Sequence, residues 1–164
     1  MSQVICQHQQ QVYRFGRGGS DEEHQKHQAD ISVLLDNHNE IQREICLLAD
    51  GFTATTTSTN PLIVKHLHDH VSDMKARFAK GRAIRSWDPV YALLFAYKDD
   101  IQISYQMRDD GVYSKVTTKN VELIELLHAH AQEVSGFVRE GRAIAGESYP
   151  ISEKLTQLLE LKTK

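Results

Sequence analysis

The sequence is short of the features that mark several large classes of protein. Its 164 residues include only two cysteines, Cys6 and Cys46, which are too few to predict a disulfide framework or a zinc ribbon. Aspartate and glutamate outnumber lysine and arginine by 22 to 19, which argues against a nucleic-acid partner because neutralising phosphates needs a basic excess. No apolar run approaches the ~20 residues that span a bilayer, and residues 1–10 lack the pattern of a signal peptide. We therefore expect a cytoplasmic protein with no membrane partner.

Motifs of common enzymes are also missing. The sequence contains no Gly-x-Ser-x-Gly, Walker A, Gly-x-Gly-x-x-Gly or His-Glu-x-x-His string, which are the signatures of several hydrolase, nucleotide-binding and metalloprotease sites. Hydrophobic residues make up 40% of the chain and charged residues 25%, as in an ordinary globular domain. A chain of this length buries roughly two thirds of its unfolded surface, so it can form a core without a structural metal.

The clearest positive feature is an internal repeat. When residues 41–84 are laid over residues 101–144, at an offset of 60 and without a gap, 13 of the 44 positions are identical, against about three expected from average residue frequencies. The identical residues include Asp-Gly at 50 and 110, histidines at 68, 70, 128 and 130, and Gly-Arg-Ala-Ile at 81 and 141. Two copies with this period predict a duplicated domain with pseudo-twofold symmetry, since a solenoid would have more and shorter repeats.

Each copy is predicted to start with a β-hairpin. In the second copy Ile101, Ile103, Tyr105 and Met107 alternate with polar residues, which is the period of a strand with one buried face. The Asp-Gly pairs supply residues that tolerate the positive φ of a tight turn. The threonine-rich run at 53–59 is β-branched and favours the return strand of the first hairpin.

A long helix is predicted to follow each hairpin. Asn60 and Asn120 are suitable N-caps, and Pro61 suits the first helical position. Gly81 and Gly141 fall where a left-handed C-cap would end each helix. Each helix has an apolar stripe with helical spacing, formed by Val64, Leu67, Val71, Met74 and Phe78 in the first copy and by Ile124, Leu127, Ala131, Val134 and Val138 in the second.

These elements predict the α+β class, with two ββα units forming a four-stranded antiparallel sheet that two long helices cover. Short helices are expected to open at Asp30 and at Asp88-Pro89. Residues 1–28 are rich in Gln, His and Gly and predict a mobile arm. A single domain then covers residues 29–164. It comprises repeat 1 at about 30–87, repeat 2 at about 88–148 and a C-terminal helix at about 150–162.

Histidine is abundant, with nine residues, and its placement suggests a site. His70 and His130 occupy equivalent positions at the margin of the two apolar stripes, and Met74 lies one turn beyond His70. His38 follows the first short helix, at the end of the predicted sheet. A histidine at such a margin can be a structural residue, a metal or haem ligand, or an acid–base group. His66 and His68 are expected to be solvated.

The chain resembles a family of small prokaryotic proteins of unknown function over about residues 27–142. The matching features are Leu-Leu-Asp-Asn-His at 34–38, Asp-Gly at 50–51, His70 with Met74, Gly-Arg-Ala-Ile at 81–84, Asp88-Pro89 with Phe95, and His130-Ala131 before Val134 and Phe137. The resemblance implies the same duplicated plan and a shared site at His38, His70, Met74 and His130, but no activity. The segment at 149–164 departs from the family, because it is rich in leucine where relatives carry a polar His- and Pro-containing tail.

Two hypotheses of different classes follow. The first is a non-enzymatic binding protein that holds a transition metal such as copper or iron, or haem, between its repeats through His38, His70, Met74 and His130, since imidazole and thioether suit those ions. The second is an interaction module that forms a homodimer through the apolar residues of the helix at 150–162. A metal-assisted hydrolase would need a carboxylate base near His70, and Asp69 and Asp73 lie poorly for that role.

Overall fold

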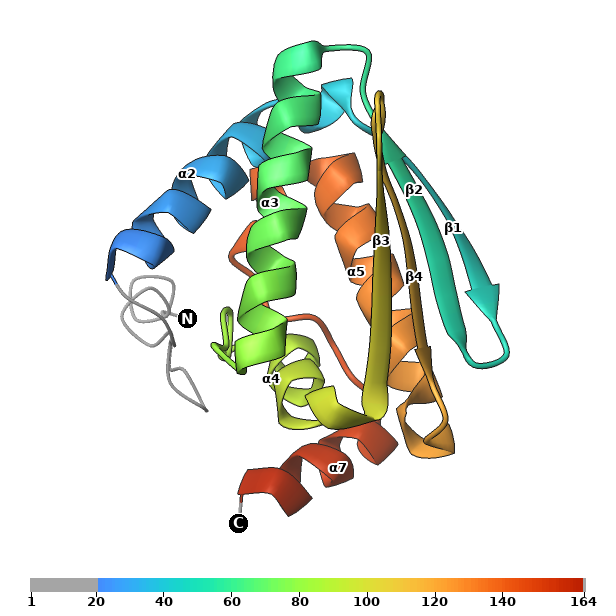
Figure 1. The fold of residues 1–164 in the computed structure, drawn as a ribbon. Coiled ribbons are helices and arrows are strands. Elements are labelled where there is room, and N and C mark those ends of the chain that lie inside the picture. The colour runs from blue at the N-terminus through green and yellow to red at the C-terminus, as the bar shows by residue number, and fades with distance from the viewer. Residues whose placement is uncertain (1–20, 164) are drawn as a thin grey trace.

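The structure is a computed structural model that describes residues 21–163. Its elements in chain order are α2 (Asp21–Asp36), η1 (His38–Glu40), β1 (Gln42–Leu48), β2 (Gly51–Thr57), α3 (Pro61–Lys80), α4 (Pro89–Ala96), η2 (Lys98–Asp100), β3 (Ile101–Arg108), β4 (Gly111–Thr118), η3 (Val121–Leu123), α5 (Ile124–Glu140), α6 (Arg142–Ala145) and α7 (Glu153–Thr163). Figure 1 shows the long helices on one side of a single sheet. The predicted α+β class and four-stranded antiparallel sheet are confirmed.

The sheet has the strand order β1-β2-β4-β3, so the return strands of the two hairpins are its centre. Their register is symmetric about the pair Ala54↔Ser114, with Gly51 opposite Thr117 and Thr57 opposite Gly111. Glycine is required at both turns, because a Cβ on either one would collide with the backbone of the opposite central strand. The two hairpins can therefore pair closely along their whole length.

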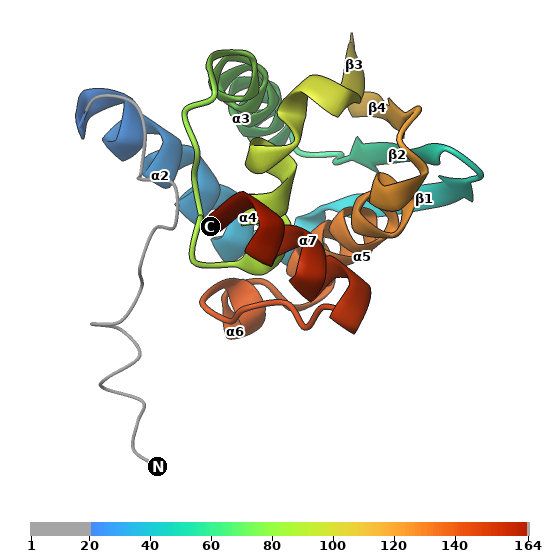
Figure 2. The same cartoon turned by 90° about the horizontal axis from the view of Figure 1, so that it is seen from below.

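The two long helices cover the same face of the sheet, as predicted. α3 packs on β4, whereas α5 packs on β1 and β2, so each helix lies mainly on the hairpin of the other half. The view from below in Figure 2 shows α3 and α5 standing apart from each other, with α4 between them in this view and α2 beside α3. Asn60 caps α3 by accepting a hydrogen bond from the backbone N–H of Leu62 at 3.0 Å.

Three elements differ from the sequence prediction. α2 begins at Asp21, so residues 21–28 of the predicted arm are helical, while residues 1–20 lie outside the described part. After Asn120 the chain first makes the 3-10 turn η3 before α5 starts. Gly81 adopts the predicted left-handed conformation, but Gly141 has φ 61° and ψ -134° and leads into the short helix α6.

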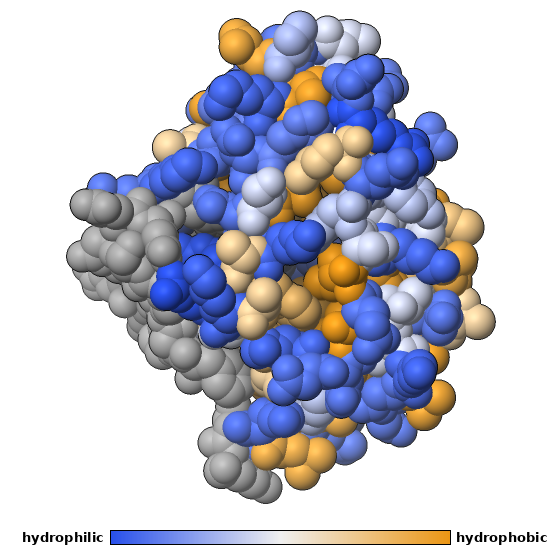
Figure 3. Space-filling view, viewed as in Figure 1, coloured by the Kyte–Doolittle hydropathy of each residue, from blue (hydrophilic) through white to orange (hydrophobic). Residues whose placement is uncertain are grey.

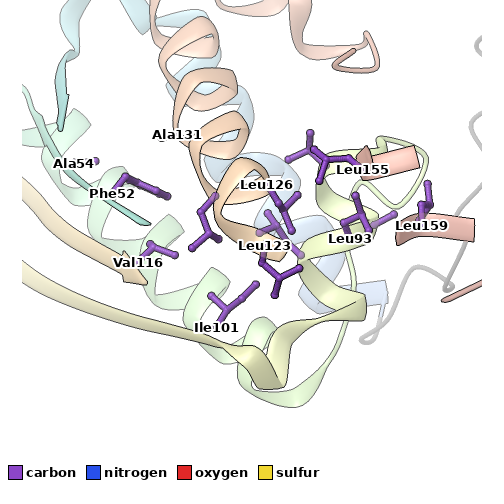
Figure 4. Packing of buried hydrophobic residues seen from close by; sticks show 14 residues of the cluster. Phe52, Ala54, Leu93, Ile101, Val116, Leu123, Leu126, Ala131, Leu155 and Leu159 are labelled. Carbon is purple, nitrogen blue, oxygen red and sulfur yellow. The ribbon is translucent and has the colours of Figure 1, made fainter. Parts of the chain in front are cut away.

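The main hydrophobic core lies at the lower end of the sheet in the view of Figure 1, where α4, α5 and α7 meet. Leu93, Leu123, Leu126 and Leu155 are at most 1% exposed there, and Figure 4 shows their side chains directed toward one another. The C-terminal helix α7 thus contributes Leu155 and Leu159 to the core of its own chain. Of its leucines, Leu161 is the most exposed, so only a small part of its apolar stripe is free for the predicted homodimer.

Candidate functional site

All four residues predicted as a site line one cavity. The cavity has a volume of about 180 Å³ and lies between α3 and α5 against the inner face of the sheet. His70 and Met74 reach it from α3, His130 from α5 and His38 from η1. The structure therefore brings together side chains that are up to 92 positions apart in the sequence, counted from 38 to 130.

The cavity exists because the hydrophobic residues divide into three clusters. One cluster lies around α4, α5 and α7, one between α2, α3 and β4, and one around Tyr91 and Phe95. α3 and α5 make few contacts with each other, and residues of all three clusters form the wall of the space between them. In Figure 3 hydrophobic atoms show between α3 and β3, surrounded by a hydrophilic surface.

His38 is held by the C-terminal part of α5. Its Nδ1 lies 2.7 Å from the backbone oxygen of Val138, and because a carbonyl oxygen only accepts, Nδ1 donates the proton. The ring lies directly on Gly141, where a Cβ would overlap it. These contacts fix the ring at the edge of the cavity with Nδ1 already used.

His70 on α3 and His130 on α5 both line the cavity. Burial lowers the pKa of His70 to about 4, opposed by the nearby charge of Asp30. Burial, followed by the positive charge of Arg43, lowers the pKa of His130 to about 3. Both rings are therefore neutral at pH 7, and each can donate one hydrogen bond and accept one.

The ring of His130 sits in an aromatic frame. It packs edge-on against Phe52 at a centroid distance of 5.9 Å and against Tyr91 at 5.5 Å. Its Nδ1 is buried without a hydrogen-bond partner among the described residues. The two aromatic contacts hold the ring of His130 in place at the wall of the cavity.

The predicted metal site does not fit this arrangement well. Among residues 21–163 no three His, Cys, Asp or Glu side chains are placed to hold one metal ion. Met74 packs against the cluster of Tyr91 and Phe95, so its thioether also has an ordinary core role. Haem is disfavoured by size, since even drug-sized molecules occupy pockets of about 300 Å³ or more.

The carboxylate that a hydrolase would require is also directed elsewhere. Asp69 forms an ion pair with Lys65 at 2.9 Å along the exposed side of α3. The ion pair lowers the pKa of Asp69, so this carboxylate is a surface group that stays ionised. None of the described aspartates or glutamates lines the cavity.

Three polar residues of the cavity wall are not singled out by the sequence analysis. These are Arg43 on β1, Tyr91 on α4 and Tyr105 on β3. For Arg43 and Tyr105 a signal exists, because the alternation that predicts the strands places both on the inner face, in step with Ile41 and Ile101. A charged residue at an inward position of a strand is unusual enough to mark a site.

The expectation that His66 and His68 are solvated is wrong, because His66 pairs with Asp30 at 3.1 Å and His68, like His128 in the other half, contacts backbone oxygens of a hairpin turn. The Nε2 of His68 lies 2.9 Å from the backbone oxygens of Arg108 and Gly111, at the turn of the second hairpin. The Nε2 of His128 lies 2.8 Å from the backbone oxygen of Leu48, at the turn of the first hairpin. Each helix therefore holds the hairpin of the other half by the same kind of contact.

Next to the cavity, Arg85 organises a buried polar cluster. It pairs with Asp88 at 3.0 Å and with Glu133 at 3.5 Å, and its guanidinium lies 4.4 Å from the ring centroid of Trp87. Burial and the adjacent Asp88 raise the pKa of Glu133 to about 9. The cluster ties the loop before α4 to α5, and the guanidinium of Arg85 also lies 5.5 Å from the ring centroid of Tyr91.

Comparisons with protein-family models, curated protein sequences and solved structures return no match for the chain, so the family resemblance stays a prediction. In the part of the chain that the structure describes, no helix is both long and apolar enough to cross a membrane. The fold and the site together define an α+β protein with one small, mainly apolar cavity between its two long helices.

Proposed function

We propose that this protein binds a small, mainly apolar molecule in the cavity between α3 and α5, and that it acts as a binding protein. The observation that carries the proposal is the convergence of two neutral histidines, an arginine and two tyrosines on a wall that is mainly apolar. Ligand sites have this character, with hydrophobic lining and a few placed polar groups. The proposal keeps the cytoplasmic location predicted from the sequence.

The volume indicates the size of the molecule. An apolar cavity of about 150 Å³ in another protein admits benzene, so about 180 Å³ has room for one aromatic ring and a few further atoms. A ligand that fills this space would remove its apolar wall from water, which favours binding.

Toluene is a suitable first probe, because it tests the cavity without any polar contact. We expect it to bind with a Kd near 1 mM or below and to raise Tm by about 3–6 °C at tenfold excess over Kd. Val134→Phe should remove binding, because Val134 lines the cavity and the larger ring would fill it. Val121→Phe is the matched control, since Val121 is 69% exposed. Equal toluene affinity in both variants, or no binding to the wild type, would contradict the proposal.

The metal and haem hypothesis names a different ligand for the same residues, and the same protein tests it. Titration with copper, iron or haemin should give near-stoichiometric binding that His70→Ala/His130→Ala abolishes if His70, His130, Met74 and His38 hold the ion. Tight metal binding that excludes toluene would favour this hypothesis over the apolar ligand. Toluene binding without metal uptake is the result that the geometry favours.

A further inference from the structure

The polar wall of the cavity is not balanced in charge. The guanidinium of Arg43 donates from Nε to the hydroxyl of Ser135 at 3.1 Å and from Nη1 to the hydroxyl of Thr56 at 3.0 Å. Both partners are neutral, and no aspartate or glutamate of residues 21–163 forms an ion pair with it. Arg43 is half-buried, and a cation held partly out of water is normally matched by an anion, because taking a charge out of water is costly.

The other groups around Arg43 are neutral too. Burial lowers the pKa of Arg43 to about 10, and the titratable groups that oppose this change are Tyr91 and Tyr105. Burial raises the pKa of Tyr105 to about 12 and raises that of Tyr91 as well, so both phenols keep their protons at pH 7. Within residues 21–163, Arg43 is then a full positive charge that is surrounded by hydroxyls and forms no ion pair with a carboxylate.

The two halves of the chain show that this charge is not part of the shared scaffold. At the offset of 60, Arg43 corresponds to Ile103, and Tyr105 corresponds to Ile45. The second half therefore has an isoleucine at the equivalent strand position, where it packs against the main core. An apolar residue is compatible with this sheet position, so the scaffold does not require the cation.

We propose that the ligand of the cavity is a small apolar monocarboxylate, such as an aromatic acid, whose carboxylate pairs with Arg43. This inference rests on the proposed function and adds the chemical class of the molecule. A guanidinium has five N–H donors in a planar fork that matches a carboxylate, and only two of them are used by Ser135 and Thr56. Tyr105 and His130 line the same cavity and can donate further hydrogen bonds.

The experiment compares benzoate with benzamide and toluene, three probes of similar size that differ in charge and polarity. By calorimetry or ligand-observed NMR at pH 7, wild-type protein should bind benzoate at least tenfold more tightly than benzamide. Arg43→Ile should lose that preference and still bind toluene. Arg43→Lys keeps a positive charge without the planar fork, so it should retain part of the preference for benzoate over benzamide. Arg108→Ile is the matched control on the neighbouring hairpin, since Arg108 is exposed, and it should behave as wild type.

The outcomes separate the two proposals. If toluene binds but benzoate has no advantage over benzamide, or if Arg43→Ile keeps that advantage, the carboxylate inference is wrong and the binding cavity stands. If neither toluene nor benzoate binds, both proposals are wrong. Should Arg43→Ile fail to fold, the benzoate-to-benzamide ratio of the wild type and of Arg43→Lys still decides the question.

Discussion

The two halves of the molecule, residues 41–84 and 101–144, are alike where they build the scaffold and different where they line the cavity. His68 and His128 make the same contact, each with the hairpin turn of the opposite half. By contrast, Arg43 and its counterpart Ile103 differ in charge and polarity. The comparison teaches that residues repeated at the offset of 60 report mainly on folding, and that the differences between the halves point to the ligand.

His70 and His130 are the exception, because they are repeated and also face the cavity. Their pKa values of about 4 and 3 lie below the ordinary 6.5, so the unfolded chain binds more protons as pH falls below about 6.5. Wild-type stability should therefore decrease between about pH 6.5 and 4, by roughly 1.4 kcal/mol per pH unit for each histidine. His70→Leu/His130→Leu should lose much less, as measured by urea unfolding at pH 7.5 and 4.5. An unchanged pH dependence would show that these rings are not buried as described.

Alanine substitutions at Gly81 and Gly141 should have the next largest effect on the free energy of unfolding, and the effect should differ between the two halves. Gly81→Ala should cost about 1–2 kcal/mol, the penalty of a left-handed residue with a Cβ. Gly141→Ala should cost more, because the new Cβ also displaces the ring of His38 and its hydrogen bond, worth about 1 kcal/mol. Urea titrations measure both, and His38→Ala should restore part of the stability of Gly141→Ala. Equal costs for the two glycines would contradict this account.

Loss of the contact that His68 or His128 makes with a hairpin turn should have a smaller effect on stability, and the effect should be equal in the two halves. His68→Ala and His128→Ala should each lower the free energy of unfolding by about 1 kcal/mol, the usual value for a lost hydrogen bond. Neither should change the affinity for toluene, because neither residue lines the cavity. A loss of toluene binding in either variant would mean that scaffold and site are not separable in this way.

The smallest effect is expected at the surface. Arg142 pairs with Asp36 on α2, and both side chains are more than half exposed. Exposed pairs contribute little because water and salt screen them. Asp36→Ala should have the same urea unfolding midpoint as the wild type within experimental error. A clear destabilisation would show that this contact anchors α2.

The fold was largely predictable from the sequence because its signals are local. Alternation marks the strands, Asp-Gly marks both turns, and Asn60 and Asn120 mark the helix starts. The start of α2 was missed because residues 21–29 include only one apolar residue, Ala29, so they show no helical stripe. That part of the helix is supported instead by polar contacts, including Asp30 with Lys26 and with His66.

The candidate site was predictable only in part. His70 and His130 could be identified because they hold equivalent positions beside the apolar stripes of the two long helices. Whether the two side chains converge depends on how α3 and α5 cross the sheet, which is a property of the tertiary structure. The cavity itself arises from the separation of these helices, and no local pattern encodes that distance. Arg43 was overlooked because a single arginine in a strand is ordinary unless its inward phase is considered.

The most direct test of the central claim is a crystal structure under xenon pressure, because xenon enters apolar cavities and is located by its anomalous scattering. We predict a xenon peak between α3 and α5, in contact with the side chains of Met74 and Val134 that line this space. A structure in which α3 and α5 close on each other, with side chains filling the space and no xenon bound, would contradict the account.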